Sequence, residues 1–178
     1  MIYGIIGTMG SGKTLFATAL ARHYHKNGST IYANFGLKFP FKPLTMKEIS
    51  DFNFDFNNSV LIIDEIHLNI DSRSSMSRKN KIISYFITQS RKRNIILIYT
   101  TQNAHQIDKR LRTNTDYIIQ CRNLTPKAKK DVYIEWTITD PNDQTRTFIM
   151  KADPIFKLYD THQIIDFDRS EFKKKKEE

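Results

Sequence analysis

The sequence predicts one α/β domain built on a mostly parallel β-sheet. Short apolar runs at residues 2–6, 60–63 and 95–101 are typical of buried parallel strands. Between the first two runs, apolar residues recur at helical spacing over residues 13–25. Alternation of strand and helix patterns favours a parallel sheet with helices on both faces, and 178 residues suit a single domain.

The last third of the chain changes pattern. Residues 132–139 and 146–150 alternate polar and apolar side chains around the turn signal Asp140-Pro141-Asn142-Asp143, which predicts an antiparallel β-hairpin at the sheet edge. We expect the domain to span residues 1–169, followed by a charged tail at 170–178. The other predicted elements are a strand at 30–34, a loop at 36–44, a short helix at 45–51, a loop at 69–80, helices at 81–92 and 107–112, and a strand at 116–121.

Composition and charge narrow the class of partner. A formal net charge of +9 favours a polyanionic partner, either nucleic acid or an anionic membrane surface, and nucleic acid is preferred over the alternative of no polyanionic partner. The single cysteine, Cys121, excludes an intrachain disulfide and is expected in the core. No signal peptide and no run of 18 apolar residues is present, so we expect a soluble, cytoplasmic protein that does not span a membrane.

A glycine-rich segment between the first strand and the first helix matches the full Walker A pattern, Gly7-x-x-x-x-Gly12-Lys13-Thr14. Its glycines let backbone N–H groups point at phosphate oxygens, Lys13 neutralises the β- and γ-phosphates, and the Thr14 hydroxyl ligates magnesium. The expected cofactors are therefore ATP and Mg²⁺. The residues expected to bind the nucleotide are Gly7, Thr8, Met9, Gly10, Ser11, Gly12, Lys13 and Thr14.

Two carboxylates follow the apolar run at 60–63. We expect Asp64 to hold the magnesium and Glu65 to accept a proton from the attacking water or to orient it. The strand at 95–101 should neighbour the phosphate-loop strand, which would bring Gln102 near the γ-phosphate. On residue type alone, Gln102 is instead expected to be a solvated glutamine in a loop. Together these features predict a RecA-like (ASCE) P-loop NTPase.

Five further segments carry a family resemblance. They are QSRKRNIILIYTTQ at 89–102, IDKRLRTNTD at 107–116, DEIH at 64–67 with DSR at 71–73, and LYDT at 158–161. With the Walker motifs, they resemble the HerA/FtsK superfamily of DNA-pumping ATPases, most closely its Zot-like branch and the small viral genome-packaging ATPases. The resemblance covers residues 2 to 165.

The resemblance implies roles for individual residues. Gln102 corresponds to the polar sensor at a strand end, and Glu65 to the water-activating carboxylate. Arg91 or Arg93 is the candidate arginine finger that reaches a neighbouring subunit's nucleotide, with Arg110 and Arg112 as runners-up. A cationic helix end without a function is the alternative for Arg91 and Arg93.

The function expected from these features is ATP-driven translocation of double-stranded DNA, without sequence specificity, into a viral capsid. The family implies a homo-oligomeric ring, expected to be a hexamer, with a capsid or portal protein as a further partner. The loop at 72–79 and the Lys173–Lys176 run are either DNA contacts or solvated segments. The alternatives are a Zot-like virion assembly or extrusion ATPase with a membrane partner, a nucleotide-gated scaffold and a helicase.

Overall fold

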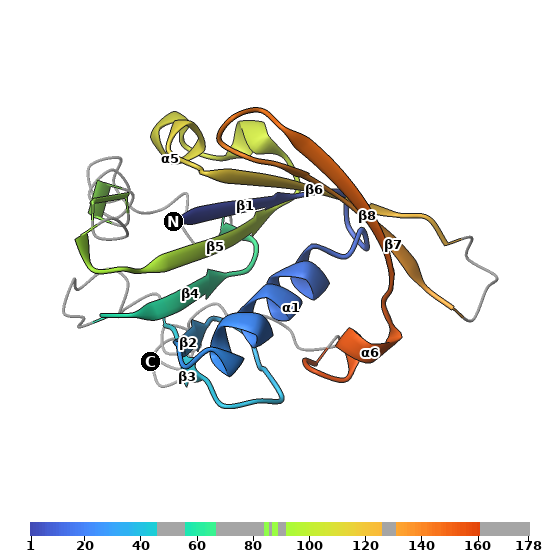
Figure 1. Ribbon diagram of the computed structural model, residues 1–178, viewed down its shortest axis with the longest axis horizontal. Coiled ribbons are helices and arrows are strands. Elements are labelled where there is room, and N and C mark those ends of the chain that lie inside the picture. Colours follow the sequence, from blue (N-terminus) through green and yellow to red (C-terminus); the bar gives the residue numbers. More distant parts are fainter. Residues whose placement is uncertain (46–55, 67–83, 86, 89–91, 126–130, 161–178) are drawn as a thin grey trace, which may run out of the picture.

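A computed structural model describes residues 1–45, 56–66, 84–85, 87–88, 92–125 and 131–160. The strands of this part form one eight-stranded sheet in the order β3-β2-β4-β5-β1-β6-β7-β8 (Figure 1). Their bounds are β1 Ile2–Ile6, β2 Thr30–Ala33, β3 Lys42–Pro43, β4 Ser59–Ile63, β5 Ile96–Thr101, β6 Tyr117–Asn123, β7 Tyr133–Thr139 and β8 Thr145–Lys151. The helices are α1 Lys13–Lys26, η1 Ala104–Gln106, α5 Lys109–Thr113 and α6 Asp153–Phe156.

The parallel part of the sheet has the phosphate-loop strand β1 near its centre. β5 lies between β1 and β4 and pairs in parallel with both. In this register Ile6 faces Thr101, and Ile63 faces Tyr99. The last residues of β1, β4 and β5 therefore reach the same edge of the sheet, which is where ligands bind in open α/β folds.

Helices cover both faces of the sheet, as the sequence predicts (Figure 1). Because successive strand residues point to opposite faces, β4 sends Val60 and Ile62 to one core and Leu61 and Ile63 to the other. The first core packs against α1 through Leu15, and the second against α5 through Leu111.

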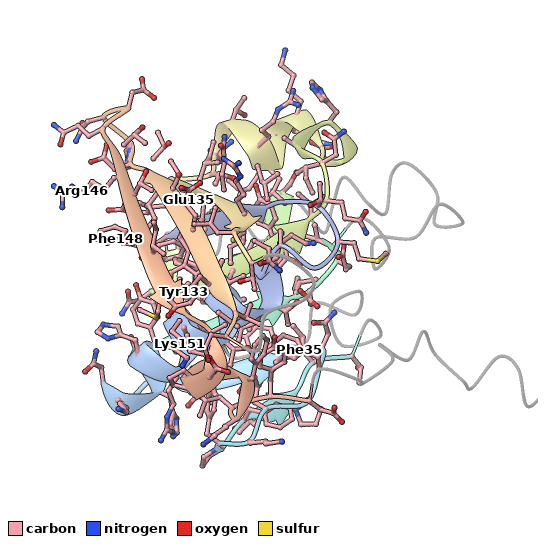
Figure 2. The ribbon with its side chains drawn as sticks, turned by 90° about the vertical axis from the view of Figure 1, so that its right-hand side faces the viewer. Phe35, Tyr133, Glu135, Arg146, Phe148 and Lys151 are labelled. Carbon is pink, nitrogen blue, oxygen red and sulfur yellow. The ribbon has the colours of Figure 1, made fainter. Side chains whose placement is uncertain are left out.

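The antiparallel hairpin is also confirmed. β6, β7 and β8 pair antiparallel, and Trp136 lies directly opposite Phe148. Figure 2 shows β8 with Phe148 labelled. Trp136 is buried and packs edge-on against Phe16 of α1. β8 is an edge strand, and all seven of its residues are exposed, including Phe148 and Ile149.

One segment differs from the prediction. The loop expected at 36–44 contains the two-residue strand β3, which pairs in parallel with Tyr32 and Ala33. Pro43 is tolerated there because β3 is an edge strand, where a missing N–H breaks no sheet hydrogen bond.

Several predictions fall outside the described residues. These are the short helix after Thr45, the loops at 69–80 and 72–79, and the tail at 170–178. In the helix predicted at 81–92, the described positions 84–85, 87–88 and 92 are helical. No helix in the described part of the chain is long and apolar enough to cross a membrane.

Candidate nucleotide site

The glycine loop has the backbone shape that its sequence requires. Gly10 and Gly12 have φ angles of 73° and 94°, a left-handed region that favours glycine. Gly7 is needed for close approach, because a Cβ there would overlap the Ser11 hydroxyl and lie 2.7 Å from the Cys121 carbonyl oxygen. The loop is anchored to β5 by a hydrogen bond from the Gly7 N–H to the Thr101 carbonyl.

Lys13 lies inside the site. It is only 5% exposed, and its ammonium donates to the Thr8 carbonyl oxygen at 3.1 Å. The same nitrogen lies 3.5 Å from Glu65 Oε1. The lysine predicted to meet the phosphates and the glutamate predicted to activate water therefore form an ion pair.

The predicted magnesium residues are in direct contact. The Thr14 hydroxyl lies 3.1 Å from each carboxylate oxygen of Asp64. The Thr100 hydroxyl donates to Asp64 Oδ1 at 2.7 Å. Burial raises the pKa of the Asp64 carboxyl, and the charge of Glu65 acts in the same direction. The hydrogen bonds from Thr100 and Thr14 and the charge of Lys13 oppose this rise in pKa.

The residues present fit a magnesium-nucleotide. Ser11 is buried inside the glycine loop, and its hydroxyl has no hydrogen-bond partner among the described residues, so it can still serve a phosphate oxygen. Thr14 and Asp64 offer the hydroxyl and carboxylate oxygens that Mg²⁺ prefers. Lys13 adds a buried positive charge for the phosphates.

Two side chains that the sequence analysis did not single out organise the turn after β4. Asn34 brackets the Asp64 backbone, accepting from its N–H at 2.8 Å and donating to its carbonyl at 3.0 Å. The Thr100 hydroxyl accepts from the Glu65 N–H at 2.8 Å. Both residues are polar and stand at or near the carboxyl end of a strand, which is the signal that could have identified them.

The β6–β7 hairpin and the C-terminal segment also reach the site. Asn123 donates to the Gly10 carbonyl at 3.3 Å, and a Cβ on Gly12 would lie 3.0 Å from Ile134. Tyr159 is buried, and its backbone forms an isolated antiparallel β-bridge with Leu37. Burial raises the pKa of Tyr159 to about 12, and the negative charge of Asp64 acts in the same direction.

The predicted sensor and finger residues lie at different edges of the sheet. Gln102 follows β5 directly and is exposed at the phosphate-loop edge. Arg93 precedes β5, and its carbonyl accepts from the Asn58 N–H at the opposite edge. The six residues of β5 separate these edges by about 20 Å. Arg91 lies outside the described residues.

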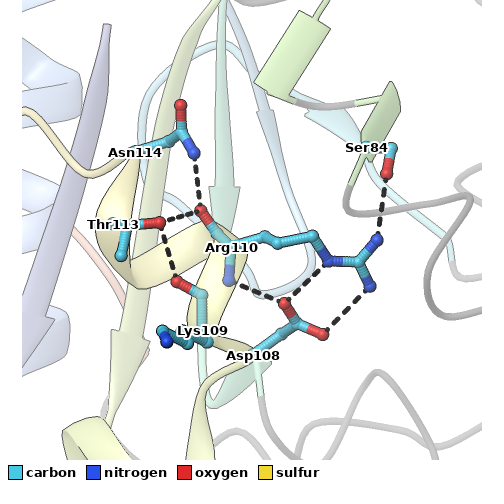
Figure 3. A network of polar contacts seen from close by, with 6 residues as sticks. All are labelled: Ser84, Asp108, Lys109, Arg110, Thr113 and Asn114. Atoms are coloured by element: carbon cyan, nitrogen blue, oxygen red, sulfur yellow. Dashed lines mark hydrogen bonds and ion pairs between the residues drawn. The ribbon is translucent and has the colours of Figure 1, made fainter.

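The runner-up arginines make contacts within their own chain. Asp108 caps α5, and its carboxylate lies 3.2 Å from the Arg110 guanidinium (Figure 3). The same guanidinium also donates to the Ser84 hydroxyl. Burial raises the pKa of the Asp108 carboxyl, but the hydrogen bonds from the side chain and backbone of Arg110, together with its charge, outweigh burial and hold the pKa below its ordinary value. Arg112 donates to the Ala104 carbonyl at 3.4 Å. Arg110 thus connects α5 with the helical segment at Ser84.

The loop, the lysine and the two carboxylates at one edge of a parallel sheet define a P-loop nucleotide-binding domain. Residues 3–123 match the ATPase family associated with various cellular activities (AAA). The chain belongs to this family, and nucleotide binding follows from that membership. No curated protein matches the chain.

Solved structures share the fold at low sequence identity. The N-terminal domain of zonular occludens toxin from Neisseria meningitidis is 18% identical, with a TM-score of 0.63 over 89% of this chain and 98% of that one. The genome packaging NTPase B204 from Sulfolobus turreted icosahedral virus 2, in complex with ATP-gammaS, is 16% identical, with a TM-score of 0.60 over 82% and 95%. The flagellar accessory protein FlaH from Methanocaldococcus jannaschii is 13% identical, with a TM-score of 0.59 over 83% of each chain. The predicted fold, and its likeness to Zot-like and packaging ATPases, are thereby confirmed.

Proposed function

We propose that the protein hydrolyses ATP to translocate double-stranded DNA, as the motor that packages a viral genome. The observation that carries the catalytic part is the convergence of Lys13, Thr14, Asp64 and Glu65 at one edge of the sheet. Lys13 would bind the phosphates. Thr14 and Asp64 would hold Mg²⁺, which neutralises charge on the phosphates when bound.

The two remaining roles belong to Glu65 and Gln102. Glu65 would accept the proton of the attacking water, and its 3.5 Å contact with Lys13 puts it beside the phosphate-binding group. Gln102, exposed at the same edge, would hydrogen-bond that water or report the nucleotide state. The arrangement supplies positioning and charge stabilisation, which are the main contributions to phosphoryl transfer.

The DNA part rests on charge and on likeness. A net charge of +9 suits contacts with DNA phosphates that do not depend on sequence and weaken with salt. Among proteins with the same fold, B204 is described as a DNA-packaging ATPase. We place the motor in the HerA/FtsK superfamily and in the cytoplasm of the host, with a capsid or portal protein as its docking partner.

We further propose that the protein assembles into a homo-oligomeric ring of six subunits, and the position of the candidate arginine finger supports this proposal. Arg93 lies about 20 Å from its own phosphate loop, so an arginine finger at this position would serve a neighbouring subunit. The exposed apolar side chains of β8, Phe148 and Ile149, give the chain a surface suited to subunit contact.

Strand displacement from a DNA triplex tests translocation. With ATP, the protein should displace a third strand bound ahead of it on a duplex, whereas Glu65→Gln should not. Unwinding of the duplex itself would instead favour a helicase. Hydrolysis without displacement would contradict the DNA motor.

The second candidate is a Zot-like virion assembly or extrusion ATPase that acts with a membrane partner. This second candidate is favoured by the structural likeness to the zonular occludens toxin domain, which extends over nearly the whole length of that domain. ATP hydrolysis indifferent to duplex DNA, with co-purification of one membrane protein, would support this candidate. A nucleotide-gated scaffold would bind ATP without turnover.

A further inference from the structure

The turn that carries Glu65 has an uncommon backbone. Glu65 has a φ angle of 49°, in the left-handed region. The other non-glycine residues with positive φ in the described part of the chain are Asn58, Asn94 and Asp143, residue types that adopt this region several-fold more often than most. A glutamate held in this region is strained and persists only where its surroundings fix it.

A single hydroxyl contacts both carboxylate residues of the turn. Thr100 Oγ1 accepts from the Glu65 N–H at 2.8 Å and donates to the Asp64 carboxylate at 2.7 Å. Thr100 is fully buried in β5, and a β-branched side chain has few χ1 rotamers, so the direction of its hydroxyl is fixed by the strand. The Thr100 hydroxyl therefore makes one hydrogen bond as a donor and one as an acceptor, both to residues of the turn.

The turn is held from the other neighbouring strand as well. Asn34 follows β2 and brackets the backbone N–H and carbonyl of Asp64. β4 therefore ends between two polar side chains, one from each strand beside it. Asn34 fixes the backbone of Asp64, where the turn begins. Thr100 fixes the backbone of Glu65, the residue with the positive φ angle.

We propose that Thr100 is a positioning residue for ATP hydrolysis, whose hydroxyl sets the left-handed backbone of Glu65 and so aims its carboxylate. This inference rests on the proposed role of Glu65 as the residue that activates water. Thr100 acts through Glu65 and Asp64 and is not expected to touch the substrate.

Three variants separate positioning from packing. Thr100→Val keeps the shape and removes the hydroxyl, whereas Thr100→Ser keeps the hydroxyl. Thr18→Val is the matched control, because Thr18 is equally buried and its hydroxyl has no partner among the described residues. We expect Thr100→Val to lower kcat about tenfold or more. We expect Thr100→Ser to restore most of it and Thr18→Val to leave it unchanged.

Two further measurements distinguish positioning from a general loss of structure. The Kd for a fluorescent ATP analogue should stay within about threefold in Thr100→Val, because the glycine loop and Lys13 are untouched. In the protein without added nucleotide, amide hydrogen exchange at Glu65, followed by NMR, should be faster in Thr100→Val than in wild type and in Thr100→Ser. If Thr100→Val does not fold, Thr100→Cys replaces it, with a weaker hydrogen-bonding group and an intermediate expected kcat.

The outcomes separate this inference from the proposed function. A kcat in Thr100→Val that equals the wild-type value would overturn the positioning role. So would a lowered kcat with unchanged exchange at the Glu65 amide. If Glu65→Gln itself keeps full turnover, the proposed role of Glu65 fails first, and the role of Thr100 in hydrolysis fails with it.

Discussion

The ammonium of Lys13 lies 3.5 Å from Glu65 Oε1, so the phosphate-binding lysine and the proposed catalytic glutamate are already paired. A nucleotide must therefore compete with Glu65 for Lys13. Because Glu65→Gln removes this competitor, we expect the variant to bind ATP at least as tightly as wild type. Titration with a fluorescent ATP analogue measures this Kd. Markedly weaker binding would mean that the pair assists the phosphate site instead of competing with it.

Gly12→Ala is expected to destabilise the fold for two reasons. A φ of 94° costs an L-residue about 1–2 kcal/mol, and the new Cβ would also lie 3.0 Å from Ile134. Gly28→Ala is the matched control, because Gly28 has a similar φ of 88° and open space around it. Chemical denaturation should show a larger loss in the free energy of unfolding for Gly12→Ala than for Gly28→Ala. Equal losses would show that the Ile134 side chain moves aside at no energetic cost.

The cysteine next to the site should be unreactive in the folded protein. Burial raises the pKa of the Cys121 thiol from 9.0 to about 12, although the charge of Lys13 opposes this. A thiol reagent should therefore react slowly near neutral pH until the chain is unfolded. Since the unfolded thiol ionises first, the contribution of Cys121 to stability is complete below pH 9 and is lost as pH rises towards 12. Fast labelling of the native chain would contradict this burial.

The fold was predictable to the level of strand order around the site, and the details of the site were not. The apolar runs and the motifs indicated that β5 neighbours β1 and that Asp64 meets Thr14. The bonds of Thr100 depend on the register between β4 and β5, which no local pattern encodes. The backbone of Glu65 was equally hidden, because glutamate is not a residue type that signals a positive φ.

Subunit mixing tests whether the arginine finger acts on a neighbour. Lys13→Ala should abolish nucleotide binding, and Arg93→Ala should abolish turnover if Arg93 is the finger. A mixture of the two variants should regain part of the activity, because an Arg93→Ala subunit keeps its phosphate loop and can receive the finger of a Lys13→Ala neighbour. Full activity of Arg93→Ala alone would transfer the role to Arg91, Arg110 or Arg112, each testable in the same way.

The most direct test of the central claim is steady-state ATP hydrolysis by the full chain, with and without duplex DNA, in wild type and Glu65→Gln. We predict hydrolysis that duplex DNA stimulates, that weakens as salt is raised, and that disappears in Glu65→Gln although nucleotide binding remains. Undiminished hydrolysis in Glu65→Gln, or no hydrolysis by wild type under any of these conditions, would contradict the account.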